Sequence, residues 1–73
     1  MRKAKRSAVE MIRQQFPVGC RVELDSMLDL YAPPAGTRGT VVGVDDTGSI
    51  MVDWDNGSRL NVCYGVDYCR RID

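Results

Sequence analysis

From Cys20 onward, apolar and polar residues alternate, and this alternation limits the possible folds more than any other feature of the chain. Cys20, Val22 and Leu24 are separated by Arg21 and Glu23. A two-residue period of this kind is typical of a strand that buries one face. A chain of 73 residues buries only about 60% of its unfolded surface, so it has one small core and no room for a second domain.

Further strand segments follow at short intervals. We expect strands at Thr37–Val44, Ser49–Trp54 and Tyr68–Ile72, with a long loop over 25–36. Val41 and Val44 cannot share a face of a regular strand, so Gly43 is expected to mark a bulge. A tight helical turn is expected over 63–67 before the last strand.

The turn after Trp54 is predicted to be a three-residue loop. A two-residue Asn56-Gly57 turn would mix apolar and polar residues on both faces of the hairpin. A loop over 55–57, with Gly57 in the left-handed region, instead pairs the residues of the two strands by character. The predicted pairs are Val52 with Leu60, Ile50 with Val62, and Asp53 with Arg59.

A short amphipathic helix is expected before the strands, from Ser7 to about Gln15. Val9, Ile12 and Phe16 recur at helical spacing, with Ala8 and Met11 beside them. Ser7 is expected to cap the helix and to form a capping box with Glu10. Pro17 disfavours helical geometry at the residue before it, so the helix should end there. A helix this short must pack on something, either its own sheet or a second copy of the chain.

Together these elements predict an SH3-like barrel: a mainly β fold, a five-stranded small barrel preceded by one short N-terminal α-helix. Residues 1–16 form a basic arm and helix, and residues 17–73 form the barrel. Closing the sheet would remove the free edges that expose a small β protein to aggregation.

The sequence resembles the family catalogued as domain of unknown function 4314. The resemblance runs from about Phe16 to Ile72. It is carried by PVGCRVEL at 17–24, APPAGTRGTV at 32–41, VDD at 44–46, VDWDNGS at 52–58 and GVD at 65–67. It implies a small accessory protein of bacterial phages or mobile elements, and it brings no assigned activity. More distantly, the pattern is similar to KOW, Tudor-like and mind-bomb-type barrels, but a fold does not fix a function.

The residue types argue against catalysis. The chain has no histidine, so the commonest general base is missing. The acidic pairs Asp45-Asp46 and Asp53/Asp55 lie at predicted turns, where aspartate is favoured for its bonds to its own backbone. Cys63 and Cys69 do not have the spacing of a zinc knuckle. We therefore expect no catalytic residue, no metal and no cofactor.

Two groups of residues remain as binding candidates. The first is an aromatic and proline group that could line a groove for a protein partner: Tyr31, Pro33, Pro34, Tyr64 and Tyr68. Trp54 is expected in the core, by its alternation with Ile50 and Val52. Binding of a protein partner is the favoured function.

The second group is basic and supports the alternative function of nucleic-acid binding: Arg2, Lys3, Lys5, Arg6 and Arg13, to which Arg70 and Arg71 could add. Residues 1–16 carry five basic groups and one acidic group, whereas the rest carries five basic and nine acidic groups. The acidic remainder and an isoelectric point near 6.1 argue against a broad nucleic-acid surface. Inhibition of a host defence nuclease is a further alternative.

Location and assembly are also expectations. The three cysteines, the missing secretory signal and the lack of an apolar stretch long enough for a membrane predict a cytoplasmic protein with reduced thiols. A homodimer through the N-terminal helix is a further prediction.

Overall fold

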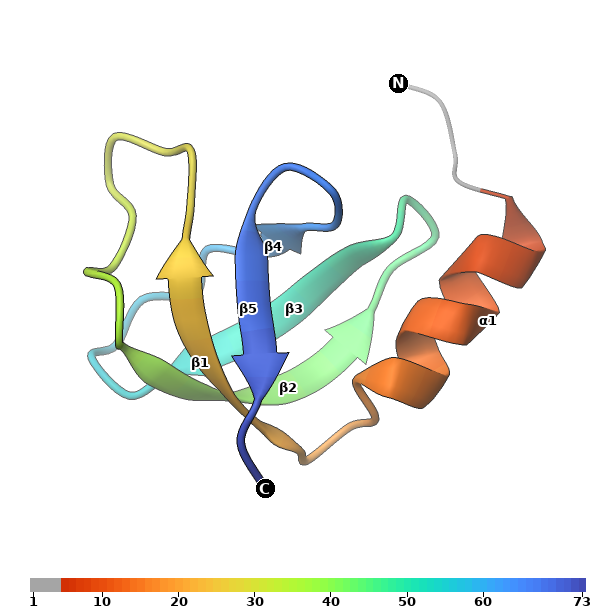
Figure 1. The fold of residues 1–73 in the computed structure, drawn as a ribbon, viewed down its shortest axis with the longest axis horizontal. Coiled ribbons are helices and arrows are strands. Elements are labelled where there is room, and N and C mark those ends of the chain that lie inside the picture. Colours follow the sequence, from red (N-terminus) through yellow and green to blue (C-terminus); the bar gives the residue numbers. More distant parts are fainter. Residues whose placement is uncertain (1–4) are drawn as a thin grey trace.

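One helix and one antiparallel sheet make up the protein in a computed structural model, which describes residues 5–73. The helix is α1 (Arg6–Gln15), and the strands are β1 (Arg21–Ser26), β2 (Arg38–Val44), β3 (Ser49–Trp54), β4 (Val62–Cys63) and β5 (Tyr68–Arg71). The sheet order is β4-β3-β2-β1-β5. Figure 1 shows the sheet curling so that β5 crosses in front of β2 and β3, with α1 at one side. The mainly β fold class with one short helix is therefore confirmed.

The sheet is open in the order of its strands. β4 and β5 are its two edges, and no strand ladder joins them within residues 5–73. Closure into a barrel therefore stays a prediction.

The helix begins one residue earlier than predicted. Lys5 occupies the N-cap position with no side-chain cap bond, so the predicted capping box of Ser7 and Glu10 is wrong. Glu10 instead lies 3.5 Å from Arg6 in an ion pair of the i,i+4 kind. The helix ends where Pro17 predicts, with the Phe16 N–H donating to the Ile12 carbonyl at 2.8 Å.

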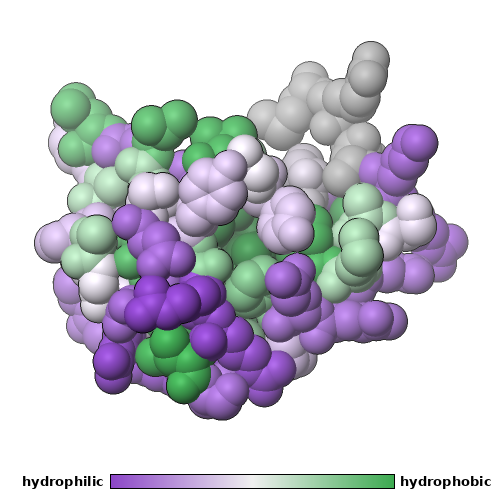
Figure 2. Space-filling model, viewed as in Figure 1, coloured by the Kyte–Doolittle hydropathy of each residue, from purple (hydrophilic) through white to green (hydrophobic). Residues whose placement is uncertain are grey.

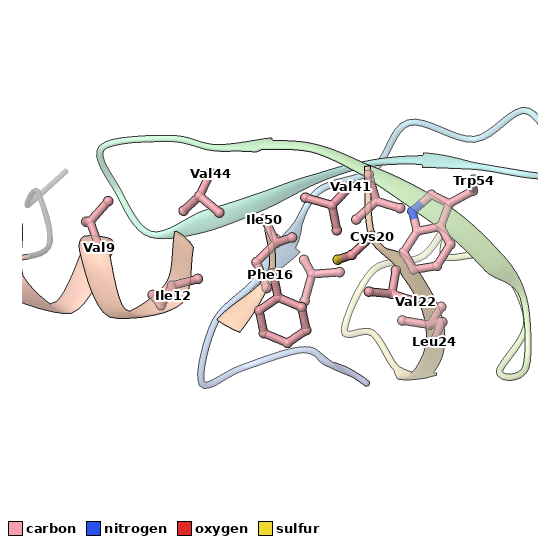
Figure 3. Close-up of a cluster of buried hydrophobic side chains, with 12 residues drawn as sticks. Val9, Ile12, Phe16, Cys20, Val22, Leu24, Val41, Val44, Ile50 and Trp54 are labelled. Atoms are coloured by element: carbon pink, nitrogen blue, oxygen red, sulfur yellow. The ribbon is translucent and has the colours of Figure 1, made fainter. Parts of the chain in front are cut away.

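The apolar face of α1 packs on its own sheet. Val9, Ile12 and Phe16 belong to the same buried cluster as the inward residues of the strands. Figure 3 shows Val9 and Ile12 on α1 pointing toward the strands that carry Val44 and Ile50. The apolar stripe that motivated a helix-mediated dimer is thus covered within one chain, while Met11 beside it is exposed. The homodimer stays a prediction.

The core follows the predicted alternation. Cys20, just before β1, and eight strand residues are each at most 6% exposed: Val22, Leu24, Val41, Val44, Ile50, Val52, Trp54 and Val62. β2 and β3 lose register between Val41 and Gly43. The predicted bulge at Gly43 is confirmed, and it lets Val41 and Val44 face the same core.

The turn after β3 has the predicted three-residue form. The Trp54 N–H donates to the Ser58 carbonyl at 3.0 Å, Gly57 has a φ of 92°, and Ile50 pairs with Val62. Residues 59–61 are not a regular strand, because the Trp54 indole N–H donates to the Leu60 carbonyl at 2.9 Å. In the predicted register, that carbonyl would have accepted the Val52 N–H.

Two smaller expectations needed correction. The first strand runs on to Ser26, because a bulge after Leu24 lets it keep pairing with β5. Residues 64–67 form a hydrogen-bonded turn, not a helical turn, since Gly65 has a φ of 87° and the Tyr64–Asp67 bridge closes it.

Charged side chains bridge the outer face of the sheet. Glu23 on β1 accepts hydrogen bonds from Arg38 at 3.2 Å and Arg70 at 2.5 Å, and Arg70 also donates to Asp25 at 2.6 Å. The hydrogen bond from Arg38, helped by the charge of Arg70, lowers the pKa of Glu23. A second pair, Arg21 with Asp55, joins β1 to the turn after β3.

These carboxylates predict a loss of stability in acid. The carboxyl groups of Glu23, Asp45 and Asp55 each have a lowered pKa, and a hydrogen bond is the largest cause for each. The donor is Arg38 for Glu23, Thr47 for Asp45 and Arg21 for Asp55. A carboxyl whose pKa is lower in the folded state stabilises it above the unfolded pKa, and this stabilisation is lost as the pH falls through the folded pKa. The melting temperature should therefore be flat from pH 7 to about pH 5 and fall below about pH 4.5. A melting temperature that rises between pH 5 and pH 3 would contradict these ion pairs.

Candidate functional site

Two segments far apart in the sequence are joined by one carboxylate. Oδ1 of Asp67 accepts the Leu28 N–H at 2.8 Å, and Oδ2 accepts the Cys63 N–H at 2.9 Å. Asp67 is only 8% exposed and is the one buried charged residue of the described chain. It fixes the loop between β1 and β2 against the turn between β4 and β5, and Figure 1 shows both at the same end of the molecule.

The loop between β1 and β2 is also held by bonds of its own. Oδ1 of Asp29 accepts the Tyr31 N–H at 2.8 Å, which forms an Asx turn. The Gly36 N–H donates to the Leu24 carbonyl at 2.7 Å, and the Thr37 hydroxyl donates to the Pro34 carbonyl at 2.7 Å. These bonds hold the loop in one shape within the protein itself.

Apolar side chains gather on these two segments. Nine large apolar residues of the described chain are exposed, and six of them lie on the loop, on the turn or at the start of β5. We call these six the apolar loop surface: Leu28, Leu30, Tyr31, Tyr64, Val66 and Tyr68. Each is between 48% and 91% exposed. Figure 2 shows hydrophobic residues along the edge of the molecule where the loop and the turn lie. A cluster of exposed apolar residues on an ordered framework is typical of an interaction site.

A hollow adjoins the apolar loop surface. It is bounded by the end of α1, by the turn between β4 and β5, and by β5 itself. It encloses about 250 Å³. Its lining includes core residues at the bottom and polar groups at the mouth: Gln15, Phe16, Ile50, Val62, Tyr64, Gly65, Asp67, Tyr68 and Cys69. The Tyr64 hydroxyl reaches Gln15 on α1 at 3.5 Å. One apolar side chain would fit a volume of this size.

The predicted aromatic groove is only partly assembled. Tyr64 and Tyr68 line the hollow, whereas Tyr31, Pro33 and Pro34 do not. Tyr31 and Pro34 are exposed on the loop, whereas Pro33 is buried. Trp54 is in the core as predicted, at 2% exposed.

The sequence-based reasoning missed Asp67, Leu28 and Leu30. Asp67 had a local signal, a Gly-Val-Asp turn before a strand, but its bond to Leu28 spans 39 positions. Leu28 and Leu30 lie in a segment without periodicity, so no pattern indicated whether they would be exposed.

Three members of the predicted basic group fall within the described residues: Lys5, Arg6 and Arg13. Arg2 and Lys3 lie outside the described residues, and Lys5 and Arg6 are exposed at the start of α1. Arg13 donates to the Val44 carbonyl at 2.9 Å and lies 3.6 Å from Asp46. Its guanidinium therefore helps to hold α1 on the sheet.

Of the two acidic pairs predicted to serve turns, only Asp45 binds the backbone of its own turn, whereas the carboxylates of Asp53 and Asp55 pair with Arg59 and Arg21. Oδ1 of Asp45 accepts the Thr47 hydroxyl at 2.6 Å and the N–H groups of Thr47 and Ser49, both at 3.0 Å. The bond from the Thr47 hydroxyl is the largest cause lowering the pKa of Asp45. Within residues 5–73, no three or more cysteine or acidic side chains are grouped so that they could hold a metal ion.

The three thiols differ in environment, which predicts their reactivity. Cys63 is exposed, whereas burial raises the pKa of Cys20 and raises that of Cys69 to about 11. The thiolate is the reactive form, so at pH 8 only roughly one Cys69 thiol in a thousand is ionised. Iodoacetamide at pH 8 should alkylate Cys63 first, as read by peptide mass spectrometry. Alkylation of Cys69 as fast as Cys63 would contradict the half-buried position of Cys69.

The helix, the open five-stranded sheet and the joined loops define a small, mainly β protein with one short helix. A family model, Domain of unknown function (DUF4314), matches residues 5–72. The chain therefore belongs to the DUF4314 family. No curated protein and no solved structure matches it. No helix in residues 5–73 has the length and apolar character needed to cross a membrane.

Proposed function

We propose that this chain is a non-catalytic binding module that recognises a protein partner through the apolar loop surface. The gathering of six exposed apolar side chains on two segments joined by Asp67 carries the proposal. An accessory role for a phage or mobile element in the cytoplasm is part of the proposal, supported by the family resemblance and by the free thiols.

Three features of the surface support protein binding. Its side chains are apolar or aromatic, the types that supply most of the energy at the centres of protein interfaces. Its framework is ordered in advance, so little conformational entropy is lost when it binds. Asp67, the one buried carboxylate among residues 5–73, accepts backbone N–H groups with both oxygens, which favours a structural role over an acid–base role.

Capture experiments with matched variants test this proposal. The tagged protein is incubated with lysate of its source organism, beside a Leu28→Ser/Leu30→Ser double variant and a Val18→Ser control. Val18 is also exposed, at 74%, but it lies between α1 and β1 and is not part of the apolar loop surface. We expect a captured protein to fall at least tenfold with the double variant, since each apolar anchor contributes on the order of 1–2 kcal/mol. It should stay unchanged with Val18→Ser.

Two other results would overturn the proposal. One is capture that is equal for the wild type and the double variant. The other is capture of nucleic acid that is lost on deleting residues 1–6 and falls steeply with salt, which would favour the basic arm.

A further inference from the structure

The outer edge of β5 is free to accept another strand. Within residues 5–73, β5 is the last strand of the sheet and pairs only with β1. The Ile72 N–H donates to the Arg21 carbonyl at 2.9 Å, in the same register that pairs Glu23 with Arg70. In an antiparallel ladder every second residue pair is hydrogen-bonded, so Arg70 and Ile72 direct their backbone groups toward β1. The N–H and C=O groups of the alternate residues, Cys69 and Arg71, therefore point away from β1. Outside the strand ladders, no hydrogen bond found within residues 5–73 uses these four groups.

The other edge strand is already capped. β4 is two residues long, and its outward residue is Cys63. The Cys63 N–H donates to Asp67, and the Cys63 carbonyl accepts the N–H groups of Val66 and Asp67 at 3.0 and 2.8 Å. The turn thus saturates the edge of β4, and β5 remains as the open edge.

The hollow lies directly beside this open edge. Cys69, whose backbone faces outward, is one of the residues that line it, together with Tyr64 and Tyr68. Figure 2 shows the surface recessed near the middle of the view, beside the strand that Figure 1 labels β5. A strand laid along β5 would therefore place every second side chain over the hollow.

We propose that the partner adds an extended segment to β5, with an apolar side chain opposite Cys69 in the hollow and an acidic residue opposite Arg70. Main-chain hydrogen bonds would supply affinity, and the hollow would supply specificity, as in other cases of strand addition. This inference rests on the proposed function, because it describes how a protein partner is held.

Charge argues for a different protein rather than a second copy as the occupant. Two copies of β5 could use all four free groups in an antiparallel pairing centred on Arg70. That pairing places Arg70 opposite its own counterpart, and like charges directly opposite one another are destabilising. Glu23 and Asp25 accept from the two terminal nitrogens of Arg70, but no hydrogen bond found within residues 5–73 uses its Nε–H, so an acidic residue at the same place can still pair with Arg70.

A capped heptapeptide, Ser-Thr-Glu-Leu-Glu-Thr-Ser, is a direct probe. Its leucine can enter the hollow while both glutamates lie on the outer face near Arg70. The peptide is titrated into the ¹⁵N-labelled protein, and amide hydrogen exchange is measured at saturation. We expect the amides of Cys69 and Arg71 to exchange at least tenfold more slowly, with little change at Arg70, which the β1 ladder already protects. A peptide with lysine at both glutamate positions should bind at least tenfold more weakly.

Arg71→Pro and Arg71→Ala form a matched pair for the edge. Both variants remove the charged side chain, but only proline removes the outward N–H, and proline is tolerated at such edge positions. Arg71→Pro should bind the peptide about tenfold more weakly than Arg71→Ala. Spectral dispersion shows whether each variant is folded.

Three outcomes would overturn strand addition. They are no binding of the heptapeptide at millimolar concentration, binding without slower exchange at Cys69 and Arg71, and equal binding by the two Arg71 variants when both are folded. If lysate capture still depends on Leu28 and Leu30, the proposed function stands and only strand addition fails. Self-association of the protein that Arg71→Pro abolishes would identify a second copy as the occupant and would also overturn it.

Discussion

Replacing Gly39 by alanine is expected to destabilise the protein by about 3 kcal/mol. Gly39 lies in β2 and pairs with Trp54 of β3. A Cβ atom there would lie 2.7 Å from Val52 Cγ1, 2.9 Å from the Asp53 carbonyl oxygen and 2.9 Å from Trp54 Cε3. Because one of these atoms is backbone and two belong to packed core side chains, the sheet itself must shift. Urea denaturation followed by tryptophan fluorescence measures the loss.

Gly43→Ala is the matched control in the same strand. The Cβ it adds would meet only Met51 Cε, at 2.7 Å, and that atom is the end of a flexible side chain that can turn aside. We expect a cost below about 1 kcal/mol. Equal costs for the two substitutions would contradict the close approach of β2 and β3 at Gly39.

Asp67→Asn is expected to lower the free energy of unfolding by about 2 kcal/mol. Asparagine has nearly the same shape, but only one of its terminal atoms accepts hydrogen bonds. Its amide nitrogen would face the N–H of either Leu28 or Cys63 and would leave that donor unpaired. Since a domain of this size is stabilised by only several kcal/mol, this is a large fraction. Thermal and urea denaturation measure it.

Asp53→Asn is the control for Asp67→Asn. Asp53 is an exposed carboxylate 3.7 Å from Arg59, and exposed ion pairs contribute less than about 1 kcal/mol. Hydrogen exchange adds a local measurement, because Asp67→Asn should speed exchange at Leu28 or Cys63, whereas Asp53→Asn should not. If both variants were equally stable, Asp67 would not be the link between the two loops.

Local rules were enough to predict the strands. The parity of side chains on the two faces selected the three-residue turn at 55–57 and required the bulge at Gly43. Each of these is a short-range constraint, because a slip of one residue would expose the whole core face.

Prediction failed where one local interaction replaced another that the sequence also allowed. Ser7 and Glu10 have the sequence of a capping box, but the helix begins at Arg6 and Glu10 pairs with Arg6 instead. Likewise, the bond from the Trp54 indole to the Leu60 carbonyl disturbs a segment whose register was predicted correctly.

The candidate site was harder to predict than the fold. Tyr64 and Tyr68 could be placed near the last turn by chain order alone, and both line the hollow. The exposure of Leu28 and Leu30 depends on how the long loop folds back, and that depends on a bond from Leu28 to a residue 39 positions away. No periodicity in the sequence encodes such a contact.

Mapping of amide shifts with a captured partner tests the central claim most directly. The partner is titrated into the ¹⁵N-labelled protein, and the perturbed amides are placed on the structure. Protein binding through the apolar loop surface and β5 predicts perturbations that cluster at 27–31 and 64–71, with little change at 6–13. Perturbations that cluster on α1, or that follow the exposed basic residues and vanish in high salt, would contradict it.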